Sequence, residues 1–134
     1  MGKKKIIVDS NVLVALFLPD DSLHKKATTL VKTLKEQENS FLSINLVLQE
    51  TSTVLSMRKS METARIFYAM HESILDSVIS VDGELERRSW EVFLVQTKKG
   101  SSFVDCAILA AVEKYKLDGI FSFDTFYPKE LRVQ

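Results

Sequence analysis

The chain has 134 residues, which fits a single domain over 1–134, and 46% of them are hydrophobic, enough for a substantial core. Its 18 Lys and Arg are balanced by 18 Asp and Glu, which argues against a strongly basic nucleic-acid clamp but leaves room for a local patch. The lone Cys106 excludes an internal disulfide and indicates a reducing, cytoplasmic location. No apolar run approaches the ~18 residues that a membrane span requires, so no membrane association is expected.

Short apolar runs alternate with longer segments of helical periodicity along the chain. The short runs predict strands at 5–8, 40–44, 77–81 and 119–123, with a weak fifth at 131–133. The periodic segments predict helices at 11–18, 23–37, 46–58, 61–75, 83–97 and 103–115. Between the last two helices, Gly100 is expected to end one, and Ser101 or Ser102 to cap the other. Strands that alternate with helices predict an α/β fold whose parallel sheet is covered on both faces.

Four acidic residues stand apart from the ordinary surface charges. Asp9 and Asp124 each fall at the carboxyl end of an expected strand. Glu50 interrupts a mostly apolar helical stripe, and Asp105 lies in the first turn of the nearly all-apolar helix 103–115. In an open α/β sheet, sites form outside the carboxyl ends of the strands, near the switch in strand order. We therefore expect these four carboxylates to converge at one edge of the sheet.

Carboxylates that converge need either protons or a cation. At ~5 Å and an effective dielectric constant of ~20, each ionised pair is unfavourable by roughly 3 kcal/mol. Hard oxygen ligands without His or Cys companions favour Mg²⁺ or Mn²⁺ over Zn²⁺, and His24 and His71 show no metal-ligand spacing. Such a site suits phosphodiester cleavage, because the metal neutralises the phosphate and lowers the pKa of a bound water.

The four acidic blocks of PIN domains resemble, in order and spacing, four segments of this chain: IIVDSNVLVALF, LVLQETSTVL, SSFVDCAILAAV and IFSFDTFY. PIN domains are compact Mg²⁺/Mn²⁺-dependent ribonucleases, and many are toxins of prokaryotic toxin–antitoxin pairs. The resemblance implies a three-layer α/β/α sandwich around a parallel sheet of four to five strands. The catalytic and metal-binding acids that it implies are Asp9, Glu50, Asp105 and Asp124. The supporting polar residues that it implies are Asn11, Ser102 and Ser122, and an aromatic residue, Tyr127, follows the last acid.

Basic and apolar surface features suggest binding partners. Lys98 and Lys99 closely precede Asp105 in the chain and are candidates for binding RNA phosphates. The expected helices 23–37 and 61–75 carry apolar stripes that could exceed what one small domain buries. These stripes include Leu30, Leu34, Ile66, Phe67 and Met70. We hypothesise a homodimer, and a groove that accepts an amphipathic segment of a small antitoxin protein.

Each acidic residue also has a purely structural interpretation. Asp9 or Asp124 could cap a turn, Glu50 could be a buried ion-pair partner, and Asp105 could complement its helix dipole. Two other functions are compatible with the pattern. A phosphohydrolase of the haloacid-dehalogenase type uses Asp-x-Asp after the first strand, but here Asn11 takes the second position. A non-catalytic PIN-like module that scaffolds a complex is the other alternative, although it would not require all four acids.

Overall fold

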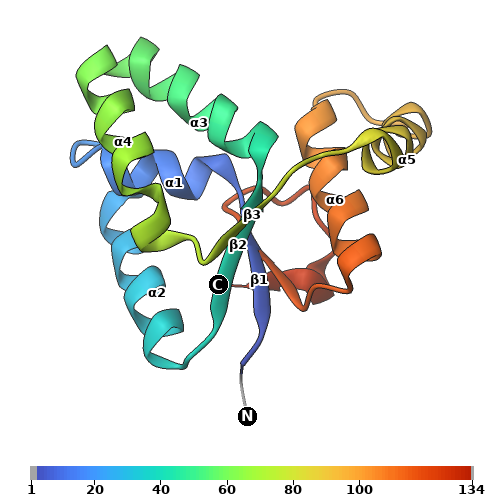
Figure 1. Cartoon of the computed structure of the whole chain (residues 1–134), viewed down its shortest axis with the longest axis horizontal. Coiled ribbons are helices and arrows are strands. Elements are labelled where there is room, and N and C mark those ends of the chain that lie inside the picture. Colours follow the sequence, from blue (N-terminus) through green and yellow to red (C-terminus); the bar gives the residue numbers. More distant parts are fainter. Residues whose placement is uncertain (1–2, 134) are drawn as a thin grey trace.

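Helices and strands alternate along the computed structural model, which describes residues 3–133 (Figure 1). In chain order they are β1 (Lys5–Val8), α1 (Ser10–Phe17), α2 (His24–Glu36), β2 (Ser40–Ile44), α3 (Asn45–Arg58), α4 (Met61–Ile74), β3 (Ser77–Ile79), α5 (Gly83–Leu94), α6 (Phe103–Tyr115), β4 (Gly119–Phe121), the short 3₁₀ helix η1 (Lys129–Leu131) and β5 (Arg132–Val133). Within that span, none of the helices combines the length and the apolar character needed to cross a bilayer.

The five strands form one parallel sheet in the order β3-β2-β1-β4-β5. The chain builds outward from β1 to β2 and β3, then crosses back to place β4 on the other side of β1. Figure 1 shows α1 to α4 on one face of this sheet and α5 and α6 on the other. The predicted three-layer α/β/α sandwich is therefore confirmed. The switch in strand order lies between β1 and β4, where ligand sites of open α/β sheets form.

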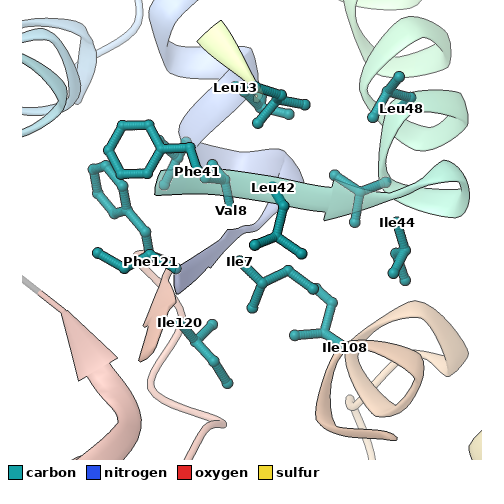
Figure 2. Packing of buried hydrophobic residues seen from close by; sticks show 14 of the residues in the cluster. Ile7, Val8, Leu13, Phe41, Leu42, Ile44, Leu48, Ile108, Ile120 and Phe121 are labelled. Atoms are coloured by element: carbon teal, nitrogen blue, oxygen red, sulfur yellow. The ribbon is translucent and has the colours of Figure 1, made fainter. Parts of the chain in front are cut away.

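The central strand is buried on both faces, which explains its unbroken apolar sequence. Ile7 is fully buried and points toward Ile108 of α6, whereas Leu13 of α1 lies on the opposite side of the sheet (Figure 2). Full burial of one such aliphatic side chain contributes about 1.5–3 kcal/mol. Covering helices on both faces thus hold β1 in place, and with it the residue that follows the strand.

Two strands end earlier than the sequence pattern predicts. The predictions of strand through 81 and through 123 were wrong, since β3 ends at Ile79 and β4 at Phe121. In both cases an Asn side chain after the neighbouring strand accepts a hydrogen bond from the backbone N–H two residues beyond the strand end. Val81 N donates to Asn45 Oδ1 at 3.0 Å, and Phe123 N donates to Asn11 Oδ1 at 3.1 Å.

Helix α5 also ends early, at Leu94 instead of residue 97. Gly100 therefore does not terminate that helix, but lies in the following loop with a φ of 106° that favours glycine. Ser102, and not Ser101, is the N-cap of α6. As a result Lys98 and Lys99 belong to an exposed loop that leads into the first turn of α6.

Candidate active site

Asp9 links the end of the central strand to the start of the first helix. Its backbone N donates to Phe121 O at 2.9 Å, continuing the pairing of β1 with β4. Its side chain caps α1, because Oδ1 accepts from Ser10 N at 2.8 Å. Oδ2 accepts from Ser122 Oγ at 2.8 Å and from the Tyr127 hydroxyl at 3.0 Å. The helix-cap interpretation of Asp9 is thus correct, but it accounts for only one of three hydrogen bonds.

The carboxyl of Asp9 is difficult to ionise in this position. Only 3% of the residue is exposed, and this burial raises its pKa from 3.8 to about 6. Hydrogen bonds from Ser122 and Ser10 lower the pKa without offsetting the burial, and the negative charge of Asp105 raises it further. Burial and the same two carboxyl groups also raise the pKa of Tyr127, which keeps its proton. A positive charge placed beside Asp9 would therefore be strongly favoured.

Asp105 is held at the N-terminus of α6 by a reciprocal capping box. Asp105 N donates to Ser102 Oγ at 3.0 Å, and Ser102 N donates to Asp105 Oδ2 at 3.1 Å. The other oxygen, Oδ1, lies 3.2 Å from the Tyr127 hydroxyl, whose single proton is shared between Asp105 and Asp9. Because the same hydroxyl contacts Asp9, the two carboxylate oxygens cannot lie farther apart than these two hydrogen bonds allow. The structure therefore brings Asp9 and Asp105 together.

Glu50 and Asp124 lie beside this pair but are linked to it indirectly. Glu50 Oε1 accepts from Ser10 Oγ at 3.0 Å, and in the part of the chain that the structure describes Glu50 forms no ion pair. Asp124 N donates to Ser122 Oγ at 3.0 Å, while its Oδ1 accepts from Phe126 N at 2.9 Å. Asp124 thus stabilises its own turn, which agrees with its structural interpretation, and within residues 3–133 its second oxygen accepts no hydrogen bond.

Asn11 and Ser122 form the scaffold that joins α1 to the end of β4. Ser122 is fully buried, and its Oγ donates to Asp9 while it accepts from Asn11 Nδ2 at 3.1 Å. Asn11 Oδ1 also accepts a hydrogen bond from Phe123 N. The Asn11 amide therefore holds the segment after β4 through both its oxygen and its nitrogen. An amide cannot exchange protons as the second Asp of a haloacid-dehalogenase site does, so this arrangement disfavours that alternative.

The acidic residues fit a hydrated metal ion better than an enclosed one. Among residues 3–133, no three Asp, Glu, His or Cys side chains are grouped closely enough to surround a metal. The expected convergence is therefore seen only for Asp9 and Asp105. Mg²⁺ usually keeps several waters and is bound by one or two carboxylates together with substrate phosphates. The pair matches that requirement in ligand chemistry and number.

A cavity of about 520 Å³ separates the loop before α6 from the segment after β4. Its lining includes Lys98, Lys99, Asp124 and Phe126. Neither lysine takes part in an ion pair within the described residues, so both ammonium groups can meet an anion. Sequence reasoning had no signal for this cavity, since its two walls are distant in the chain.

A parallel sheet with a buried Asp9 and a half-buried Asp105 at its switch in strand order defines an α/β domain with an acidic edge. The family model of the PIN domain matches residues 6–129, which is most of the chain. The chain therefore belongs to the PIN domain family, as its four acidic blocks predict.

Two relatives extend this result. The chain is 29% identical over 119 residues to the 23S rRNA-specific endonuclease VapC20 of Mycobacterium tuberculosis, covering 89% of this chain and 88% of that protein. The crystal structure of VapC20, described as a sarcin–ricin loop cleaving toxin, matches with a TM-score of 0.80 and 26% identity, over 90% of this chain and 91% of that one. The crystal structure of VapBC2 from Rickettsia felis bound to a promoter DNA fragment has a TM-score of 0.64 at 14% identity, over 96% and 97% of the two chains, and supports the fold alone.

Proposed function

We propose that this chain is a Mg²⁺- or Mn²⁺-dependent endoribonuclease that acts as the toxin of a toxin–antitoxin pair. The observation that carries the proposal is the buried Asp9 and its partner Asp105, joined by one hydroxyl beyond the carboxyl end of β1. Membership of the PIN domain family and similarity to an endonuclease toxin support the same reaction. We further propose a cytoplasmic location, where RNA substrates are found.

The proposed roles of the acidic residues differ with their hydrogen-bond partners. Asp9 and Asp105 hold the divalent cation, which when bound would neutralise the phosphate and lower the pKa of water. Ser10 N and Ser122 Oγ orient Asp9, and Ser102 orients Asp105. These fixed donors keep the two carboxylates facing the same space without rearrangement.

The other two acids complete the proposed site from its margins. Glu50 uses only Oε1, toward Ser10, within the described chain. Its Oε2 is available to bind a water of the hydrated cation or to take a proton from it. Asp124, whose Oδ1 accepts from Phe126 N, lines the same cavity as Lys98 and Lys99, where an RNA phosphate would enter. The two ammonium groups attract the RNA backbone without selecting sequence.

The decisive experiment is metal-dependent cleavage of a defined RNA. Because the VapC20 relative acts on 23S rRNA, the first substrate is a transcript containing the sarcin–ricin loop, compared with an unstructured RNA. We expect discrete cleavage in millimolar Mn²⁺ or Mg²⁺ and none in chelator. Asp9→Asn and Asp105→Asn should each reduce the rate by roughly 100-fold or more, whereas the exposed Asp20→Asn should not.

Other outcomes of this experiment would lead to other conclusions. Cleavage that survives the chelator, or that persists in Asp9→Asn, would refute the metal mechanism. A preparation that cleaves neither RNA would favour the non-catalytic interaction module.

The expected partners are an antitoxin and a second copy of the chain. Part of the apolar surface predicted for this role is absent, because Leu34 and Phe67 are buried in the core. The predicted Ile66 and Met70 are exposed, and so are three further apolar side chains near the α3–α4 hairpin: Met57, Met61 and Tyr68. We propose that these exposed apolar side chains contact a partner.

Two measurements test the partners separately. We expect a neighbouring reading frame to encode a small antitoxin protein, and co-expression with it should yield a stable complex and suppress RNA cleavage. Sedimentation of the chain alone over micromolar concentrations should show a dimer. A strictly monomeric chain would refute the homodimer and leave the antitoxin proposal intact.

A further inference from the structure

Tyr127 is the single residue in the described chain whose hydrogen bonds reach both members of the acidic pair. Its hydroxyl lies 3.0 Å from Asp9 Oδ2 and 3.2 Å from Asp105 Oδ1. The other donors serve one acid each: Ser10 and Ser122 contact Asp9, and Ser102 contacts Asp105. These donors belong to separate segments, so none of them sets the distance between the two carboxylates.

The position of the phenol is itself well determined. The side chain is 2% exposed, and its ring meets Phe126 edge to face with centroids 5.3 Å apart. The preceding turn is closed by the Asp124 side chain, which accepts from Phe126 N. Pro128 follows with a φ of −54° and leads into η1. Packing, turn and proline together fix the position of the hydroxyl.

The hydrogen bonds leave room for a cation on the same two acids. An ionised carboxylate has about four lone-pair sites. Asp9 uses two on Oδ2 and one on Oδ1, and Asp105 uses one on each oxygen. Each acid therefore retains acceptor capacity while the hydroxyl bridges them.

We propose that Tyr127 is a positioning residue whose hydroxyl spaces Asp9 and Asp105 so that both can bind one hydrated divalent cation. This inference rests on the proposed function, because it presumes that the pair binds metal. The phenol makes no contact with substrate in this role. It acts through the two acids, as a partner outside the direct ligand set typically does.

Metal binding without RNA tests the inference. Tyr127→Phe keeps the ring and deletes the hydroxyl, and Tyr115→Phe, at a 40% exposed position, is the matched control. We expect Tyr127→Phe to raise the Kd for Mn²⁺ about 10–100-fold, measured by the electron paramagnetic resonance signal of free Mn²⁺, and the control to leave it unchanged. RNA cleavage by Tyr127→Phe should fall at limiting Mn²⁺ and recover at saturating Mn²⁺. A purely structural role would not give that recovery.

The outcomes separate this inference from the proposed function. Equal Mn²⁺ affinity in wild type and Tyr127→Phe overturns the role of Tyr127 alone. Absence of Mn²⁺ binding by the wild type overturns both proposals.

Should Tyr127→Phe not fold, the wild-type protein labelled with 3-fluorotyrosine gives an independent readout. The chain has three tyrosines, so Tyr68→Phe and Tyr115→Phe assign the remaining ¹⁹F resonance to Tyr127. That resonance should shift on addition of Mg²⁺ while the other two stay in place. A Tyr127 signal indifferent to Mg²⁺, in protein that binds the ion, overturns the inference.

Discussion

Replacing Asp9 by Asn should stabilise the metal-free protein at neutral pH. Folding raises the pKa of Asp9 from 3.8 to about 6, so the ionised carboxylate opposes folding. At 1.36 kcal/mol for each pKa unit, this opposition amounts to about 3 kcal/mol. Asn is nearly isosteric and neutral: its Oδ1 can accept from Ser10 N, and the Tyr127 hydroxyl can accept from its amide while donating to Asp105. For a domain of this size, the gain corresponds to roughly 10 °C in Tm.

The sign of the pH dependence follows from the same shift. A carboxyl whose folded pKa lies above its unfolded pKa binds more protons in the native state, so stability falls as pH rises between the two values. For Asp9 this window runs from 3.8 to about 6. The advantage of Asp9→Asn should therefore be absent near pH 4, grow through pH 5, and be complete above pH 7.

Thermal unfolding in chelator, at several pH values, measures this difference directly. Asp20→Asn, which removes an exposed carboxylate, controls for the change in net charge. In millimolar Mn²⁺ the difference in Tm between the two proteins should shrink or reverse, because bound Mn²⁺ adds RT ln(1 + [L]/Kd) to the free energy of unfolding of the wild type. An Asp9→Asn protein that melts at or below the wild-type temperature at pH 8 in chelator would refute the electrostatic reasoning.

Three further substitutions test other parts of the structure. Ser122→Ala removes a buried hydroxyl with several hydrogen-bond partners and should lower the free energy of unfolding by about 1–3 kcal/mol in urea titrations; an unchanged midpoint would contradict the scaffold role. Gly119→Ala would place a Cβ 2.5 Å from Val133 Cγ2, so β5 must shift. We expect the free energy of unfolding to fall by about 1–3 kcal/mol and amide hydrogen exchange in β5 to become faster. An unchanged free energy of unfolding would mean that β5 is only loosely attached. Joint replacement of Lys98 and Lys99 by Ala should weaken RNA binding and reduce the slope of log K against log salt by about 1.4–1.8, whereas an unaltered slope would place the RNA elsewhere.

The fold was largely predictable because each buried strand carries a local signal. The run that ends at Val8 is apolar throughout since helices cover both of its faces, and the acidic blocks marked the family. Strand ends were less predictable. Beyond the end of β4, Phe123 N donates to Asn11, more than a hundred residues away, and no local sequence pattern indicates that contact.

The proximity of Asp9 and Asp105 was predictable from the sequence, but the hydrogen bonds that connect them were not. Asp9 and Asp105 were identified from their places in the sequence, and the structure brings them together. The bridging hydroxyl of Tyr127 was not foreseen, because the sequence marked this residue only as an aromatic position. Asp124 shows a second limit of sequence-based prediction. An acid at the end of a strand can also accept a hydrogen bond within its own turn, and the sequence does not reveal that bond.

The pairing of β1 with β4 also determines when the site can exist. Asp9 is translated more than a hundred residues before β4, Ser122 and Tyr127. At typical rates of synthesis, roughly ten seconds separate Asp9 from Tyr127. During that time β1 lacks one neighbour, and the Asp9 carboxylate lacks both of its hydroxyl donors. The acidic pair is therefore assembled only after both sequence-distant segments have left the ribosome.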